Sequence, residues 1–164
     1  MIGGGRAWVF GDDIDTDALA PGAYMKGSLQ ALAAHCLEAV DPSFAKQVRP
    51  GDVVVAGRNF GMGSSREQAP QALKHLGVAA VLARSFAGIF YRNALNLGLP
   101  ALVSGDVAEI RPGDRVELDP ETGVVRNLGT GAVLGAEPLP AFLVEMLRDG
   151  GLVPHLEKRF RRAS

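Results

Sequence analysis

The residues best suited to chemistry lie in one glycine-rich stretch, Gly57–Glu67, which reads GRNFGMGSSRE. Ser64 and Ser65 carry hydroxyl groups, and the adjacent Arg66 carries a planar fork of donors that matches a carboxylate or a phosphate. Glycines allow the backbone to approach a ligand closely. The stretch therefore predicts a site for an anionic ligand.

The two serines also have a purely structural interpretation. Ser64 stands three residues before Glu67, and Ser65 three residues before Gln68, which is the spacing of a capping box at a helix start. Arg66 favours a ligand site instead, because a helix cap does not require an arginine. The pattern leaves both alternatives open.

Familiar nucleotide and hydrolase motifs do not fit the same stretch. A P-loop requires lysine followed by serine or threonine after its second glycine, whereas Ser64 follows Gly63 here. The spacing of Gly57, Gly61 and Gly63 is not that of a dinucleotide fingerprint. Ser64 also lacks the Gly-x-Ser-x-Gly spacing of a nucleophile elbow. The motif indicates an anion site without identifying the anion.

The flanking segments predict the elements that position this site. Residues 52–56, DVVVA, follow a Pro50-Gly51 turn and form a β-branched block typical of a buried strand. Residues 68–77 contain helix formers and end on a glycine suited to a C-cap. Residues 78–83 are continuously apolar, as in a strand covered on both faces. Strand, helix and strand in this order predict a right-handed parallel crossover.

Further elements are expected on both sides of this crossover. A strand at 6–10 and a helix capped by Ser28 and extending to residue 37 precede it, and a helix at 86–97 capped by Ser85 follows it. Residues 99–164 predict a small β-meander and two helices, with strands at 101–103, 115–118, 123–126 and 132–134 and helices at 141–148 and after residue 151. The expected fold class is α/β: one domain, residues 1–164, with a small parallel-strand core flanked by helices and a β-meander.

The composition excludes several classes of function. A formal charge of −1 gives no electrostatic case for nucleic-acid binding. No stretch approaches the roughly 20 apolar residues of a membrane span, and the N-terminus lacks a signal sequence. A single cysteine, Cys36, cannot form an internal disulfide and cannot alone hold zinc or an iron–sulfur cluster. We therefore expect a cytoplasmic protein without a metal site of its own.

Two polar segments outside the glycine-rich stretch have open interpretations. A calcium loop beginning at Asp13 would need glycine and glutamate where Ala18 and Tyr24 stand, so the acidic segment 12–17 is either a solvated loop with a helix cap or part of a site. Residues 24–26 either contact a ligand or place an aromatic and a thioether in the core. The predicted helix at 86–97 has three polar residues that we expect to be solvated: Arg92, Asn93 and Asn96.

Three of these stretches together resemble a known family: residues 11–17, 57–67 and 85–93. They are similar, in matching order, to the small swivel-domain subunit of the aconitase superfamily, in the 3-isopropylmalate dehydratase and homoaconitase group. The likeness covers nearly the whole chain. It implies a swivelling β/β/α domain of the aconitase C-terminal type.

The resemblance also implies a reaction. Members of this group are heteromeric hydro-lyases that move a hydroxyl group between neighbouring carbons of a dicarboxylic or tricarboxylic acid by dehydration and rehydration. A large partner subunit holds a [4Fe–4S] cluster, and the small subunit supplies a base. The implied substrate is 3-isopropylmalate, in leucine biosynthesis. Homoaconitase, a dimethylmalate-type dehydratase and a non-catalytic carboxylate-binding module are the alternatives, and self-association of the small subunit stays open.

Carried over residue by residue, the resemblance implies roles for five residues. Ser64 corresponds to the proton-transferring base, and Arg66 corresponds to the clamp on a substrate carboxylate, with Ser65 beside it. Thr16 and Asp17 correspond to an acidic active-site position, at which Asp17 is the second catalytic candidate. These residues come from two separate segments, which the fold must bring together.

The resemblance assigns substrate selection to the loop that contains Tyr24, Met25 and Lys26. In this group an apolar residue at the third position suits an isopropyl group, and a basic residue suits an additional carboxylate. Lys26 departs from the apolar pattern and is not arginine. The loop therefore leaves the choice between isopropylmalate, homoaconitate and small alkyl malates open.

Overall fold

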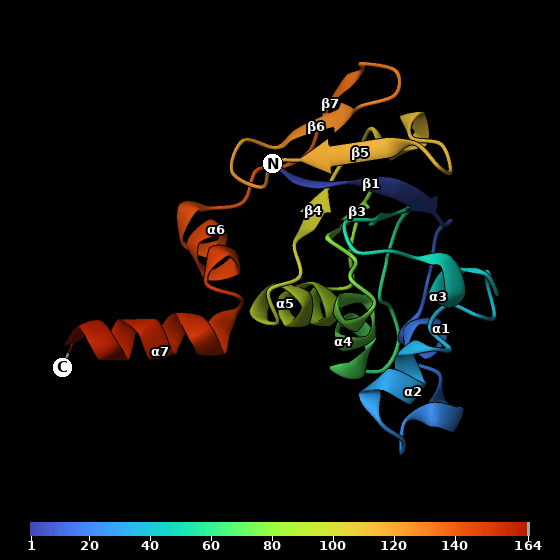
Figure 1. Ribbon diagram of the computed structural model, residues 1–164, viewed down its shortest axis with the longest axis horizontal. Helices are drawn as coiled ribbons and strands as arrows, with labels where there is room; N and C mark the ends of the chain where they lie inside the picture. Colours follow the sequence, from blue (N-terminus) through green and yellow to red (C-terminus); the bar gives the residue numbers. More distant parts are fainter. Residues whose placement is uncertain (164) are drawn as a thin grey trace.

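The structure, a computed structural model, describes residues 1–163 as a curled seven-stranded sheet with helices (Figure 1). The strand order is β4-β3-β2-β1-β5-β6-β7, parallel from β1 to β4 and antiparallel from β1 through β5 to β7. The strands are β1 (Ile2–Val9), β2 (Val53–Ala56), β3 (Ala80–Ala83), β4 (Ala101–Val103), β5 (Arg115–Leu118), β6 (Val124–Asn127) and β7 (Val133–Gly135).

Helices connect the parallel strands and form the C-terminal end of the described chain. They are α1 (Thr16–Leu19), α2 (Leu29–Ala33), α3 (Phe44–Gln47), α4 (Gln68–His75), α5 (Gly88–Asn96), α6 (Ala141–Arg148) and α7 (Leu152–Ala163), with 3₁₀ turns η1 (Gly22–Tyr24) and η2 (Val107–Glu109). Helix α4 joins β2 to β3, and α5 joins β3 to β4, so both make parallel crossovers. The predicted α/β fold class is confirmed.

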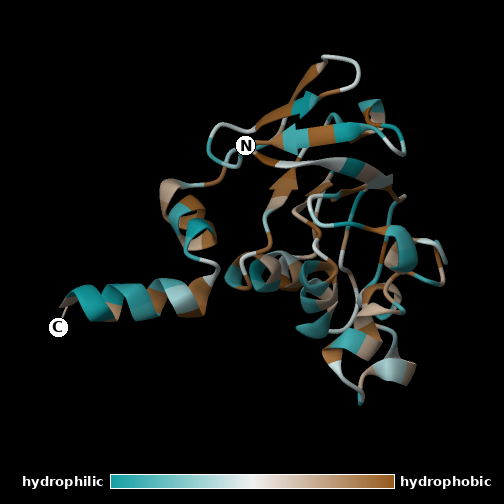
Figure 2. Cartoon of the chain, viewed as in Figure 1, coloured by the Kyte–Doolittle hydropathy of each residue, from teal (hydrophilic) through white to brown (hydrophobic). Residues whose placement is uncertain are grey.

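Two hydrophobic cores lie on the two faces of the parallel strands. Val54 and Val81 face the core under the helices, whereas Val53 and Leu82 face a second core shared with Val116 of the meander. Every residue of β2 and β3 is buried, as the continuous apolar runs predicted. In Figure 2 the arrow of β4 is largely brown, whereas the ribbon of the C-terminal helix α7 is largely teal. The curled sheet therefore gives the site a rigid support.

The bounds or the partners of several predicted elements differ from the structure. Strand β1 begins at Ile2 rather than at residue 6, because a register shift between Gly3 and Arg6 accommodates a glycine run that has low strand propensity. Strand β4 pairs in parallel with β3, so the meander consists of β5, β6 and β7 alone. Helix α2 ends at Ala33, although Ser28 caps its start as predicted, accepting a hydrogen bond from the Ala31 amide at 3.1 Å.

Ser85 does not cap the helix that follows it. Helix α5 begins at Gly88, and its first residues have no side-chain cap. Ser85 Oγ instead accepts a hydrogen bond from the Asn59 amide at 2.8 Å, which ties the segment before α5 to the glycine-rich stretch. The prediction was wrong because the Ser85 hydroxyl accepts a long-range hydrogen bond from Asn59, whereas local spacing had assigned it to the helix start.

Candidate active site

A hollow of about 130 Å³ lies between the glycine-rich turn and the start of α5. Five polar side chains line it: Thr16, Ser64, Ser65, Arg66 and Asn93. Its other walls are glycines and the apolar residues Ala87, Ile89 and Phe90 of the α5 start. One side of the hollow can therefore receive a charged group and the other an alkyl group.

Aromatic packing holds the turn against α5. Phe60 is fully buried, and its ring lies edge-on to Phe90 at 5.2 Å between centroids. Gly61 has a φ of +85°, and a Cβ at this position would collide with the Phe90 ring. The Ala87 amide donates to the Phe60 carbonyl at 2.9 Å. A residue without a side chain is thus required where the turn crosses the helix.

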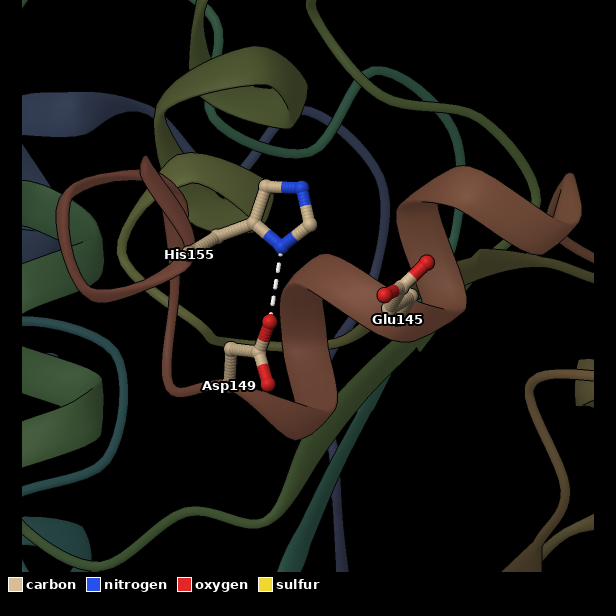
Figure 3. Close-up of side chains that lie close together, drawn as sticks. All are labelled: Glu145, Asp149 and His155. Atoms are coloured by element: carbon tan, nitrogen blue, oxygen red, sulfur yellow. Dashed lines mark hydrogen bonds and ion pairs between the residues drawn. The ribbon is translucent and has the colours of Figure 1, made fainter. Parts of the chain in front are cut away.

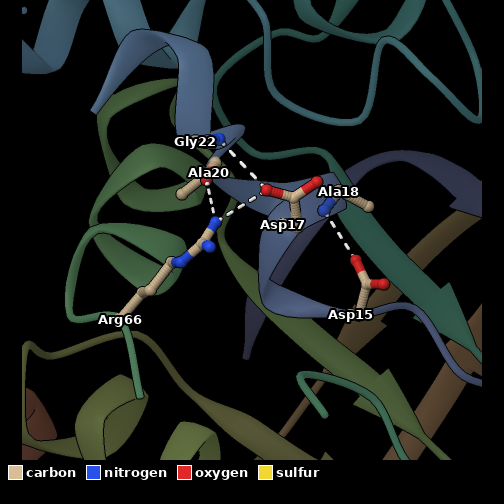
Figure 4. Close-up of polar contacts among 6 residues, drawn as sticks. All are labelled: Asp15, Asp17, Ala18, Ala20, Gly22 and Arg66. Carbon is tan, nitrogen blue, oxygen red and sulfur yellow. Dashed lines mark hydrogen bonds and ion pairs between the residues drawn. The ribbon is translucent and has the colours of Figure 1, made fainter. Parts of the chain in front are cut away.

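Backbone hydrogen bonds attach the acidic segment to the same turn. The Thr16 amide donates to the Met62 carbonyl at 2.8 Å, and Asp12 Oδ1 accepts from the Arg58 amide at 2.7 Å. Asp15 caps α1 through an Asx contact, accepting from the Ala18 amide at 2.7 Å (Figure 4). The segment therefore combines both interpretations: Asp12 and Asp15 are structural, and Thr16 lines the hollow.

Ser64 and Ser65 do not form the capping boxes that their spacing allowed. Helix α4 begins at Gln68 and has no side-chain cap, and both serines are exposed. Within residues 1–163, neither hydroxyl makes a hydrogen bond. The hydroxyl groups are therefore available to a bound molecule.

Two helix starts present unpaired backbone donors at the hollow. The amides from Gly63 to Gln68, before α4, donate to no protein acceptor in the described part of the chain, and neither do those of Gly88 to Phe90 at the start of α5. Such amides carry the positive end of the helix dipole. Their convergence makes the hollow a site for negative charge.

Arg66 joins the hollow to the acidic segment. Its Nη1 donates to Asp17 Oδ1 at 2.9 Å and to the Ala20 carbonyl at 2.8 Å (Figure 4). The Arg66 hydrogen bond, and then one from the Gly22 amide at 3.1 Å, hold the pKa of Asp17 below its usual range. Nη2 donates to no group within the described residues. This edge of the guanidinium can therefore bind a ligand carboxylate.

The structure does not bring the predicted selectivity loop to the hollow. Tyr24 stacks on His35 with 3.6 Å between ring centroids, Met25 packs on the core under the helices, and Lys26 is exposed. None of the three lines the hollow in this chain. The loop is nevertheless connected to the site, because Gly22 in η1 donates to Asp17.

Asn93 is a site residue that the sequence prediction missed. It was expected to be solvated with Arg92 and Asn96, but it is half-buried and lines the hollow. Its side-chain amide makes no hydrogen bond within residues 1–163. The signal lay in helical spacing: residues 89, 90 and 93 share one face of α5, and that face meets the turn only in three dimensions.

The donor set of the hollow does not suit an iron–sulfur cluster. Clusters of this kind are held by several cysteine thiolates. The chain has one, Cys36, which is fully buried in the core and does not line the hollow. Burial also raises the pKa of its thiol, which keeps the sulfur protonated. A cluster near this site would have to be held by another chain.

The fold and the hollow define an α/β protein with a site suited to an anionic ligand, lined by side-chain hydroxyl groups and one arginine. The family described as the aconitase C-terminal domain matches residues 19–104, and the chain belongs to this family. The predicted family and swivel-type fold are thereby confirmed.

Similar proteins carry more particular names. The chain is 53% identical to "3-isopropylmalate dehydratase small subunit 1" of Methanopyrus kandleri, covering 97% of this chain and 95% of that one. It is 52% identical to "Methanogen homoaconitase small subunit" of Methanothermobacter thermautotrophicus, over 94% and 90% of the two chains. A solved structure of 3-isopropylmalate dehydratase from Methanocaldococcus jannaschii is 46% identical and superposes with a TM-score of 0.91, covering 97% and 95%.

Among the described residues, no helix is both long and apolar enough to cross a lipid bilayer.

Proposed function

We propose that this chain is the small subunit of 3-isopropylmalate dehydratase and acts in leucine biosynthesis in the cytoplasm. The chain is a hydro-lyase subunit of the aconitase family, as its relatives are. The observation that carries the proposal is the composition of the hollow. A Ser64 hydroxyl without a protein partner, the Arg66 guanidinium with Nη2 unpaired in the described chain, and two helix starts converge there. Homoaconitase is the second candidate, because one relative of similar identity carries that name.

The proposed chemistry begins with binding of a substrate carboxylate by Nη2 of Arg66. The amides before α4 and at the start of α5 add donors to the same anion. Bound in this way, the substrate presents the C–H bond next to its carboxylate to Ser64 in its alkoxide form, whose Oγ accepts the proton and becomes a hydroxyl group. The same donors lower the cost of negative charge on Oγ, which would otherwise be a very strong base.

Loss of the substrate hydroxyl needs a Lewis acid, which a [4Fe–4S] cluster on the large subunit would supply. This division of labour is supported by the lone buried Cys36, which leaves this chain without a ligand set for a cluster. Rehydration would return a proton from Ser64. The small subunit thus binds, orients and exchanges a proton with substrate.

The residues that line the hollow, and the absence of Lys26 from its lining, favour an alkyl malate over a tricarboxylate as substrate. Ala87, Ile89 and Phe90 give it an apolar wall, which suits an isopropyl group. Lys26, the residue that would favour an additional carboxylate, does not line the hollow. A panel containing isopropylmalate, homocitrate and small alkyl malates, assayed on the assembled enzyme, should show the highest kcat/KM for isopropylmalate.

The main test is substitution of Ser64. We expect no activity from this chain alone and dehydratase activity with a cluster-loaded large subunit. Ser64→Ala should lower kcat by about 10²–10⁴-fold, the usual contribution of a positioned base, while the subunits still associate. Thr130→Ala, which removes an exposed hydroxyl in the β6–β7 turn, is the matched control and should leave kcat unchanged.

Two results would contradict the proposal. Unchanged turnover in the Ser64→Ala enzyme would remove the proton-transfer role. Absence of any activity or association with a large subunit would favour the alternative of a non-catalytic carboxylate-binding module.

A further inference from the structure

Helix α7 has an apolar face that no described part of the chain covers. It is twelve residues long and has no buried residue. Val153, Leu156 and Phe160 recur at helical spacing along one face, and their exposed fractions are 63%, 39% and 70%. In Figure 1 the helix runs away from the body of the molecule. An amphipathic helix normally buries such a stripe against a core.

Specific contacts nevertheless hold α7 at a defined angle to α6. His155 Nδ1 lies 2.7 Å from Asp149 Oδ2, at the end of α6 (Figure 3). Lys158 Nζ donates to Asp149 Oδ1 at 3.0 Å. The hydrogen bond with His155, and then that from Lys158, hold the pKa of Asp149 below its usual range. This carboxylate therefore clamps the start of α7.

The same cluster is not a convincing cation site. Glu145, Asp149 and His155 place possible ligand atoms within 4.8 Å of one another. However, both oxygens of Asp149 are already engaged, one by His155 and the other by the ammonium group of Lys158. A positive charge in this position disfavours a metal ion. The clamp interpretation accounts for all of the contacts.

The charge on α7 indicates what covers its apolar stripe. Its polar positions hold one glutamate, Glu157, and four cationic residues: Lys158, Arg159, Arg161 and Arg162. The whole chain has a formal charge of −1, so positive charge is concentrated on this helix. Two-fold pairing with a second copy would place these cations against one another, which is unfavourable. A partner with acidic residues around an apolar groove is complementary.

We propose that α7 docks by this stripe into an apolar groove with an acidic rim on the large subunit. The inference rests on the proposed function, which requires such a subunit. Val153, Leu156 and Phe160 are the anchors of a helix-in-groove contact at positions i, i+3 and i+7. Phe142, near the start of the preceding helix α6, is also exposed, at 66%. The fixed angle of α7 suits a shaped protein groove better than a lipid surface.

The test measures association of the full-length chain with purified, cluster-loaded large subunit. Val153→Ser combined with Phe160→Ser should raise the Kd by about thirtyfold or more, as expected for loss of central apolar anchors. At saturating large subunit, kcat should stay within about twofold of the parent value, because these residues do not line the hollow. Val133→Ser on β7, a residue 67% exposed, is the matched control and should not change the Kd.

A second pair of variants tests the acidic rim. Arg159→Glu with Arg162→Glu should weaken association and flatten its dependence on salt, because attraction between exposed charges is screened by ions. Arg126→Glu, on the exposed face of β6, is the charge-matched control. Circular dichroism and thermal unfolding of each variant establish that the chain is folded.

Several outcomes would overturn the docking proposal. An unchanged Kd in the Val153/Phe160 double variant would contradict it. A dimer of the isolated wild-type chain that is lost in this variant would also contradict it, because the stripe would then pair with a second copy. Binding of α7 to anionic vesicles with no effect of the substitutions on subunit association would assign the stripe to a membrane. If the wild-type complex is active and the double variant associates equally well, the docking proposal is wrong but the proposed function stands. If the wild-type subunits do not associate, both the docking proposal and the proposed function are wrong.

Discussion

At the residue scale, the site depends on side chains whose hydrogen-bonding groups are left free. Ser64 and Asn93 make no side-chain hydrogen bond within residues 1–163, and Arg66 uses only one of its terminal nitrogens. Ser64 is exposed, whereas Arg66 and Asn93 are half-buried. Their free donors and acceptors surround one hollow, where a bound ligand can use them.

Asn93 should contribute to substrate binding. Asn93→Asp places a carboxylate among donors arranged for an anion, so we expect KM to rise by about 10–100-fold, the effect of roughly 1.4–2.7 kcal/mol. Asn93→Ala should have a smaller effect. The measurement is steady-state kinetics of the assembled enzyme. Asn96→Asp, one turn further along α5 and outside the hollow, is the control; equal effects of both aspartates would argue against a direct contact.

The contact between Asp17 and Arg66 should persist in mildly acidic solution. Since the folded-state pKa of Asp17 is lowered, chiefly by Arg66, the stabilising contribution is present above the ordinary pKa of 3.8 and is lost as the pH falls through the lower value. A carboxyl carbon NMR titration of Asp17 should therefore show its midpoint below 3.8. Arg66→Gln should move the midpoint upward, and an unmoved midpoint would contradict this account.

At the scale of elements, the site is formed where a turn and a helix start come into close contact. Gly61 permits this approach, because the Phe90 ring occupies the space of a Cβ. Gly61→Ala should lower the free energy of unfolding by more than about 2 kcal/mol, through a positive φ and overpacking against the ring.

The matched control is Gly88→Ala, at the first residue of α5. A Cβ there would meet nothing within 4 Å, and we expect a change within about 1 kcal/mol. Chemical denaturation of both variants measures the difference. A Gly61 variant as stable as the Gly88 variant would show that the turn can move away from α5 at little cost.

At the scale of the whole molecule, β1 connects the two halves of the sheet. It pairs in parallel with β2 and antiparallel with β5, and the second core is shared between residues of both halves. Neither half can therefore separate without breaking strand pairing and exposing apolar surface. We propose on this basis that residues 1–164 form one domain.

Thermal unfolding should accordingly be a single transition. Trp8 lies on β1, and its fluorescence should change at the same midpoint as far-ultraviolet circular dichroism, which follows the helices and sheet. Two separated midpoints would show that the parallel half and the meander unfold independently.

Local sequence patterns predicted an anion site and most of the elements. The β-branched and apolar runs of β2 and β3, the helix that follows the turn, and the conjunction of serines with Arg66 could all be predicted, because they depend on neighbours in the chain. The single cysteine likewise indicated that any cluster belongs to another subunit. These are properties of residue type and short-range spacing.

Only the tertiary structure decided which residues meet. Ser85 accepts a hydrogen bond from the glycine-rich turn and does not cap α5, and β4 pairs with the parallel strands. Asn93 lines the hollow, whereas Lys26 does not. Each outcome depends on partners far away in the sequence, and no local pattern encodes them. The hollow itself exists because a curled sheet brings two helix starts and the acidic segment to one place, which makes a site from residues that are separate along the chain.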